Sequence, residues 1–131
     1  MIKKTLLTAT MLLTATAFAA QKWPAGVKTE KSASGAKVLS DGKGMTLYTF
    51  DKDAAGKSVC NGPCAKNWPP LLVTGENAMA MGDWTIVTRD DGAKQWAYKG
   101  KPLYTWIKDT APGQTTGDGV GTVWHTASRN Y

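Results

Sequence analysis

The chain alternates short runs of hydrophobic residues with polar turns. Strand-like runs, rich in β-branched and other large apolar residues, occupy residues 71–73 and 85–88. The 14 glycines and 6 prolines divide the chain into short segments, and no stretch after residue 20 keeps the apolar period of a long helix. The pattern therefore predicts an all-β fold, with one short helical turn near residues 63–67.

One sequence pattern occurs twice in the chain. Residues 47–53 read LYTFDKD and residues 103–109 read LYTWIKD, 56 positions later, and the same offset relates Trp68 to Trp124. Self-similarity at a period of roughly 50 residues indicates a repeated unit of secondary structure. We therefore predict two tandem, pseudo-symmetric repeats.

The repeats are expected to span about residues 25–73 and 84–128 and to form one small domain, residues 20–131. Neither half is large enough to bury an apolar face alone. Each repeat is interpreted as a β-hairpin, at residues 36–50 and 94–106, with glycine in the turn. The predicted fold is thus a small all-β domain of two hairpin-based repeats with long loops.

The N-terminus predicts export. Residues 1–19 combine a positively charged start, an uncharged segment and an A-x-A site that ends at Ala19, which is the pattern of a secretory signal peptide. In the mature chain that this leaves, residues 20–131, no segment is long and apolar enough to span a bilayer. We therefore expect a periplasmic or secreted protein, and no lipid anchor, because no cysteine lies near the cleavage site.

The charge of the chain points to no particular partner. The formal net charge of +6 falls to +4 when Lys3 and Lys4 leave with the signal peptide. The lysines are scattered rather than clustered, so nucleic acid is not an expected partner. No P-loop, dinucleotide fingerprint, GxSxG or HExxH motif is present, and we expect no cofactor.

The repeated motif resembles a known family. Its positions in the first copy and the second are Tyr48 and Tyr104, Phe50 and Trp106, and Asp53 and Asp109. This pattern is similar to the bacterial secreted repeat of unknown function, a family of predicted lipoproteins with a Y-x-(F/W/Y)-x-x-D motif. The resemblance implies export and tandem repeats but no activity, and the missing lipid-accepting cysteine favours a soluble form.

The recurring tyrosines and aspartates are interpreted first as structural residues. An aspartate after a strand commonly closes a turn through its carboxylate, and a half-buried tyrosine needs a partner for its hydroxyl. The alternative places Asp53 and Asp109 together at the pseudo-twofold axis, as the acid/base pair of a hydrolase or as a cation site.

The chain has two cysteines, Cys60 and Cys64, on either side of a turn-forming Asn-Gly-Pro sequence. In an oxidising compartment the expected state is one disulfide. The alternative is a copper-type metal site or a thiol redox pair that uses both cysteines and His125, the only histidine. Three methionines could add thioether ligands to such a site: Met45, Met79 and Met81.

Six tryptophans are many for a chain of this size, and aromatic rings can stack on sugars or quinone-like rings. Trp68, Trp124 and the adjacent His125 are therefore candidate ligand-binding residues. Repeat equivalence favours a core position for Trp68 and Trp124. Trp23 and Trp96 have no equivalent and are the better candidates for exposure.

The sequence favours an exported, non-enzymatic binding or structural module of the bacterial cell envelope, with no catalytic residue assigned. Its partner is expected to be a small ligand or an envelope component. The competing hypotheses are a periplasmic metal or thiol redox protein that uses Cys60, Cys64 and His125, and a hydrolase that uses Asp53 and Asp109.

Overall fold

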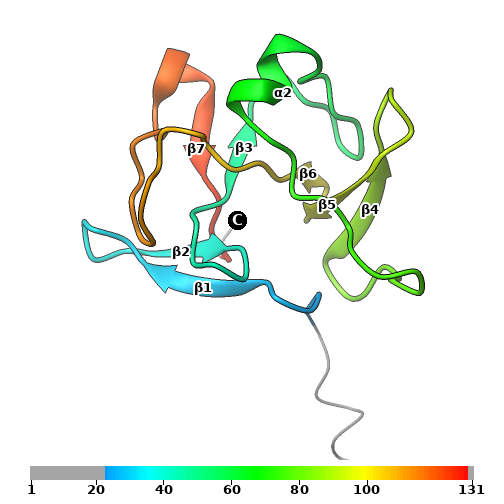
Figure 1. Cartoon of the computed structure of the whole chain (residues 1–131), viewed down its shortest axis with the longest axis horizontal. Helices are drawn as coiled ribbons and strands as arrows, with labels where there is room; N and C mark the ends of the chain where they lie inside the picture. Colours follow the sequence, from blue (N-terminus) through cyan, green and yellow to red (C-terminus); the bar gives the residue numbers. More distant parts are fainter. Residues whose placement is uncertain (1–22, 130–131) are drawn as a thin grey trace, which may run out of the picture.

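A computed structural model describes residues 23–129 of the chain. The predicted signal peptide, residues 1–19, lies outside the described residues and stays a prediction. The described part consists largely of short strands joined by loops (Figure 1).

Short antiparallel strands make up the regular structure. Three small sheets pair β1 with β2, β3 with β7, and β4 with β5 and then β6. The all-β prediction is confirmed, and the predicted helical turn is a five-residue helix. In chain order the elements are β1 (Lys28–Lys31), β2 (Lys37–Ser40), β3 (Tyr48–Phe50), α2 (Pro63–Asn67), β4 (Trp84–Thr88), β5 (Lys94–Tyr98), β6 (Lys101–Pro102), η1 (Val120–Thr122) and β7 (Trp124–Thr126).

Each repeat begins with a hairpin, β1–β2 in the first and β4–β5 in the second. The two hairpins close alike, because Ser32 N donates to the Ala36 carbonyl over 2.7 Å and Arg89 N donates to the Ala93 carbonyl over 2.8 Å. The tandem repetition seen in the sequence is therefore a repetition of backbone structure.

The predicted second strand of each hairpin differs from the structure in extent. In the second repeat a Lys99–Gly100 turn, with φ of 50° and 83°, leads from β5 into the two-residue strand β6. In the first repeat only Ser40 and Thr46 pair as expected, and the later strand β3 pairs with β7 of the other repeat. Tyr48 and Tyr104 of the repeated motif therefore pair with residues of the other repeat rather than with their own hairpins.

The two repeats are intertwined. Tyr48 in the first repeat pairs with Thr126 near the end of the second, and Tyr104 in the second pairs with Pro70 near the end of the first. Pro70 has no N–H to donate, and this explains why no regular strand corresponds to β7 in the first repeat. At the centre Tyr48 N donates to the Tyr104 carbonyl over 2.7 Å and Tyr104 N donates back over 3.0 Å.

Large aromatic side chains fill the interior. One buried cluster contains Leu39, Leu47, Trp84, Trp96, Tyr98, Leu103 and Ala127, and the other contains Tyr48, Cys60, Trp68, Tyr104 and Trp124. The expected exposure of Trp96 is wrong, because its side chain is only 5 % exposed, whereas Trp23 is partly exposed. Trp96 lies on β5 opposite Ile86, inside a hairpin that supplies one wall of the core.

Gly117 permits close packing of the second cluster. A Cβ atom at this position would lie 2.7 Å from Cη2 of Trp68 and 3.0 Å from Cγ of Trp106. These rings belong to different repeats and are held by stacking, so neither can move aside cheaply.

The variant Gly117→Ala is expected to lower the free energy of unfolding by about 1–3 kcal/mol, because overpacking forces the two rings apart. Urea denaturation followed by tryptophan fluorescence measures the change. Thr115→Ala, two residues away, is the matched control and should stay within about 0.5 kcal/mol of wild type. An unchanged midpoint for Gly117→Ala would contradict the packing described.

Candidate functional site

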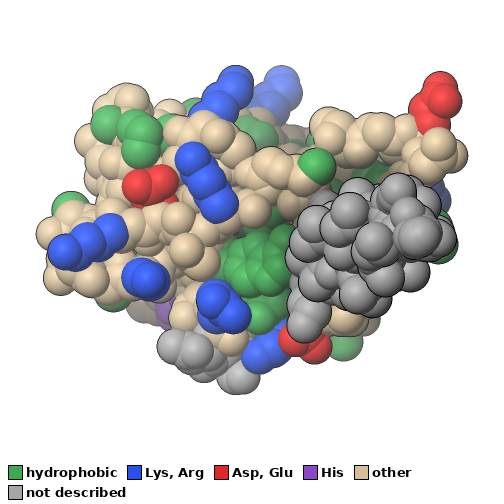
Figure 2. Space-filling view, turned by 90° about the horizontal axis from the view of Figure 1, so that it is seen from below, with side chains coloured by type: hydrophobic (Ala, Val, Ile, Leu, Met, Phe, Trp, Pro, Cys, Tyr) green, Lys and Arg blue, Asp and Glu red, His purple; other side chains and the backbone are tan. Residues whose placement is uncertain are grey.

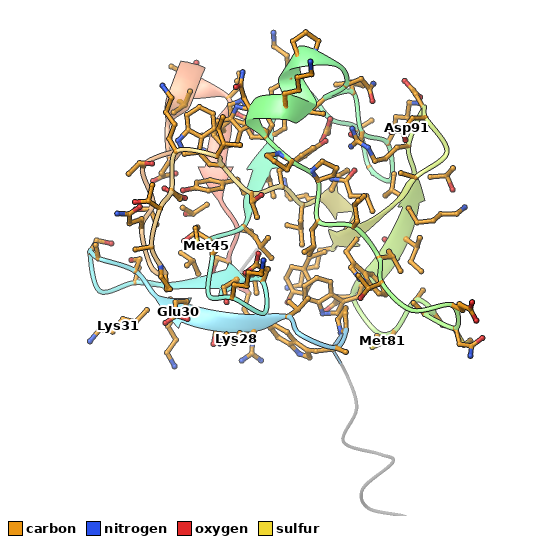
Figure 3. All side chains as sticks on the ribbon, in the orientation of Figure 1. Lys28, Glu30, Lys31, Met45, Met81 and Asp91 are labelled. Atoms are coloured by element: carbon orange, nitrogen blue, oxygen red, sulfur yellow. A yellow bond between two sulfur atoms is a disulfide. The ribbon has the colours of Figure 1, made fainter. Side chains whose placement is uncertain are left out.

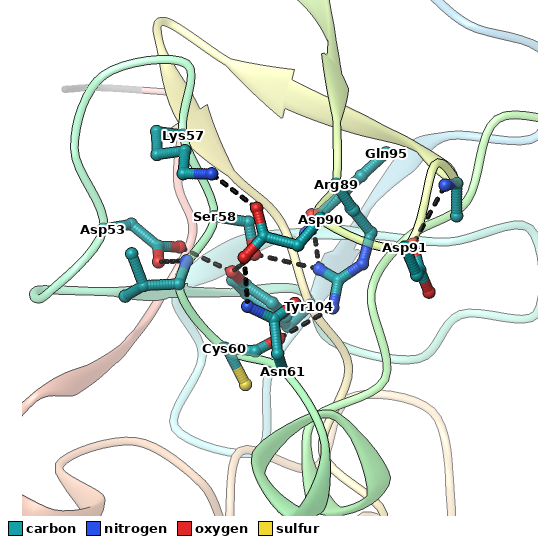
Figure 4. Close-up of polar contacts among 12 residues, drawn as sticks. Asp53, Lys57, Ser58, Cys60, Asn61, Arg89, Asp90, Asp91, Gln95 and Tyr104 are labelled. Carbon is teal, nitrogen blue, oxygen red and sulfur yellow. Dashed lines mark hydrogen bonds and ion pairs between the residues drawn. The ribbon is translucent and has the colours of Figure 1, made fainter.

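The tyrosine of each repeat donates a hydrogen bond to the aspartate of the other. The Tyr48 hydroxyl lies 2.6 Å from Oδ2 of Asp109, and the Tyr104 hydroxyl lies 2.6 Å from Oδ2 of Asp53. Because Tyr48 and Tyr104 also pair through their backbones, the pseudo-twofold axis passes between them. The Asp53–Tyr104 half of this arrangement is drawn in Figure 4.

The second oxygen of each carboxylate orders the loop that follows its own motif. Asp53 Oδ1 accepts from Val59 N over 2.8 Å. Asp109 Oδ1 accepts from the backbone N–H of Thr116 over 3.0 Å and from its hydroxyl over 2.6 Å. Each aspartate thus connects its own loop to the tyrosine of the other repeat.

Burial and hydrogen bonding control the protonation of these groups. Desolvation, reinforced by the neighbouring carboxylate, raises the pKa of both Tyr48 and Tyr104 far above its ordinary value, so both hydroxyls stay protonated as donors. Desolvation also raises the pKa of Asp53, against the opposing effect of the bonds from Tyr104 and Val59. The two carboxylates, proposed above as an acid/base pair, are each bound to a different tyrosine.

Four aromatic rings form a continuous stack through the second cluster. Trp68 and Trp124, which are repeat equivalents, stack at 3.8 Å with an angle of 2° between their planes. Phe50 covers the outer side of Trp124 at 4.2 Å, and its equivalent Trp106 covers Trp68 at 3.9 Å.

The position of each ring in the stack determines whether a ligand can reach it. The side chains of Trp68 and Trp124 are 5 % and 4 % exposed, so these two candidate ligand-binding residues belong to the core. Phe50 and Trp106, at the two ends, are partly exposed.

Cys60 and Cys64 form the disulfide expected from the sequence. Cys60 is fully buried, and the bridge joins the loop before α2 to the first turn of that helix. His125 lies on β7 with Nε2 2.8 Å from Asp51 Oδ2, in an exposed contact. The structure therefore places His125 against a carboxylate.

The ligand set considered for a metal is not brought together. Among residues 23–129 no three histidine, cysteine, aspartate or glutamate side chains converge on a point. Met45 and Met81 lie on different sides of the molecule in Figure 3.

Sequence reasoning missed a buried arginine. The Arg89 side chain is 4 % exposed; its guanidinium donates to Ser58 Oγ over 2.9 Å, to Gln95 Oε1 over 2.8 Å and to the Cys60 carbonyl over 2.7 Å (Figure 4). Ser58 Oγ also lies 2.6 Å from the Tyr104 hydroxyl. Arg89 thus connects the disulfide loop of the first repeat to the hairpin of the second.

An open cleft lies beside the first motif, between the repeats. Its volume is about 340 Å³, and its walls come from residues 50, 51 and 53–55 of the first repeat and 99–102 of the second. Another cleft, of about 420 Å³, borders Arg129, the last residue that the structure describes.

The surface gives no sign of a single charged patch on the face seen in Figure 2, where lysine and arginine side chains are spread around a small hydrophobic area. No helix within the described residues has the length and apolar character needed to cross a membrane.

Comparison with known families identifies the repeats. The family model described as a secreted repeat of unknown function matches residues 28–72 and 85–128, more than half of the chain. The chain belongs to this secreted-repeat family. The resemblance noted in the sequence is confirmed, and the two matches agree closely with the predicted repeats. No curated protein and no solved structure gave a match.

In this member of the secreted-repeat family, Tyr48→Phe and Tyr104→Phe are each expected to lower the free energy of unfolding by about 1–3 kcal/mol, because a buried or partly buried carboxylate oxygen loses its donor. Each variant also removes a second partner, because the Tyr48 hydroxyl accepts from the Gly117 N–H and the Tyr104 hydroxyl contacts Ser58 Oγ. The Tyr48 variant should be the more affected, since Ser58 keeps its bond from Arg89. Denaturant unfolding of both variants measures the effect. Unchanged midpoints would contradict the role given to the hydroxyls.

Proposed function

We propose that this chain is an exported, non-enzymatic binding module of the bacterial cell envelope. In this proposal the two repeats form a rigid scaffold, and the surface where they meet binds the partner. The observation that carries the proposal is the use of both motif tyrosines and both motif aspartates in hydrogen bonds between the repeats. A general acid or base has to reach its substrate, whereas these groups are bound to the scaffold.

Export rests on three independent points. The family is described as secreted. The N-terminal residues have the composition of a signal peptide, and the Cys60–Cys64 disulfide suits an oxidising compartment. Periplasm and exterior both meet these conditions, and the proposal covers either.

The metal or thiol redox hypothesis receives less support. A metal site needs Cys60 and Cys64 as free thiolates together with His125, whereas the cysteines are bonded to each other and His125 contacts Asp51. A redox pair would have this disulfide as its oxidised form, but Cys60 is fully buried, and thiol–disulfide exchange requires access to the sulfur. The hydrolase hypothesis likewise needs Asp53 and Asp109 to give up the tyrosines that hold them.

Co-sedimentation tests the proposal. Mature protein is mixed with peptidoglycan sacculi and, separately, with membrane vesicles from a producing bacterium. We expect saturable retention on one fraction. Tyr48→Phe, whose altered side chain is buried in the scaffold, should be retained equally at a temperature where it stays folded.

Two outcomes would contradict the binding module. One is an absence of retention on every fraction. The other is release of soluble products from a fraction, lost in an Asp109→Asn variant that remains folded, which would establish the hydrolase instead. Asp109 is chosen for this control because it lies away from the cleft.

A further inference from the structure

The cleft beside the first motif combines surfaces from both repeats. Phe50, Asp51 and residues 53–55 form one wall, and the turn at residues 99–102 forms the other. Its volume of about 340 Å³ falls at the small end of the range for ligand pockets, roughly 300–1,000 Å³. Phe50, the end ring of the aromatic stack, is part of its lining.

The equivalent loop and turn in the other half have a similar backbone arrangement but tighter side-chain packing. Gly56 N donates to the Gly100 carbonyl over 2.9 Å, and its counterpart Gly113 N approaches the Gly44 carbonyl at 3.4 Å. A Cβ atom on Gly44 would lie 2.9 Å from Cβ of Pro112, whereas one on Gly100 would lie 3.7 Å from Cβ of Ala55. The side chain at the position of Ala55 and Pro112 therefore determines how much open space remains beside the glycine of the facing turn.

The lining offers an apolar surface and both kinds of hydrogen-bonding group. One face of the Phe50 ring is covered by Trp124, and the residue is otherwise partly exposed. Asp51, which is exposed and contacts His125, provides acceptors, whereas both oxygens of Asp53 already accept from Tyr104 and Val59. The lining also contains Lys101 and Lys99, and the Lys99 ammonium donates to the Arg129 carbonyl over 3.2 Å. With the two aspartates, the formal charges of the lining balance.

We propose that this cleft binds a neutral saccharide of one or two rings, with the apolar face of one ring against Phe50. Sugar hydroxyls both donate and accept hydrogen bonds, so they match a lining that contains carboxylates and ammonium groups. An anionic ligand would meet the two aspartates, and a cationic ligand would meet the two lysines. The inference rests on the proposed function and gives its binding site a ligand class.

The internal symmetry supplies a variant that narrows the cleft without disturbing the fold. Lys57 N donates to the Ala54 carbonyl over 3.0 Å with Gly56 at φ 70°, which is a type II turn with Ala55 at its second position. The other half has the same turn, with Gly113 at φ 81° and Pro112 in place of Ala55. Ala55→Pro therefore suits the backbone and brings a ring toward Gly100.

The test is isothermal titration of the mature protein with maltose, cellobiose and N,N′-diacetylchitobiose. Digalacturonate and the deacetylated chitobiose serve as charged comparisons. We expect one neutral disaccharide to bind more tightly than either charged one. Ala55→Pro should weaken that binding by at least about tenfold, and Phe50→Leu, which removes the flat ring but keeps apolar bulk, by about tenfold.

Pro112→Ala is the matched control, because it changes the equivalent turn away from the cleft and should leave affinity within about twofold of wild type. Equal binding by wild type and Ala55→Pro would overturn the assignment to this cleft. A protein that sediments with an envelope fraction but binds none of the neutral sugars would overturn the saccharide inference alone. Failure of both sedimentation and sugar binding would overturn the proposed function as well.

Discussion

The structure depends on two hydrogen bonds that cross between the repeats, from Tyr48 to Asp109 and from Tyr104 to Asp53. A carboxylate that is buried, as in Asp109, or partly buried, as in Asp53, is costly unless donors surround it, and here one donor always comes from the other half. An isolated repeat would keep its aspartate and lose the tyrosine that binds it. The repeated motif therefore acts as an interface between halves of one chain, and the stacking of Trp68 on Trp124 follows from the same symmetry.

Local sequence patterns predicted much of the fold but little of how the halves combine. The repeated motif, the strands near residues 85–88 and 94–98 and the helical turn at residues 63–67 all carry local signals, and all are present. The pairing of Tyr48 with Thr126 joins positions in different repeats, and no periodicity within one segment reports such a contact. Arg89 lies in a polar Arg-Asp-Asp-Gly sequence, which is typical of a solvent-exposed turn. Its guanidinium is nevertheless buried against the disulfide loop.

The two repeats share the residues that join them and differ at residues on the surface. Tyrosine, aspartate and tryptophan are kept in both halves, where they support the interface. The halves differ where Ala55 replaces Pro112 in equivalent turns, and where His125, which contacts Asp51, occupies the position that Pro69 has in the first repeat. Ala55 lines the open cleft and His125 contacts Asp51 in its wall, so the surface beside this cleft differs from the equivalent surface of the other half.

The hydrogen bonds between the repeats require both repeats to unfold as one cooperative unit. Native-state hydrogen exchange of the Tyr48 and Tyr104 backbone amides, each of which donates to the carbonyl of the other residue, measures this cooperativity. Both amides, and those of β2 and β5, are expected to exchange with the free energy of global unfolding. Exchange of one repeat through a lower-energy opening, while the other stays protected, would contradict it.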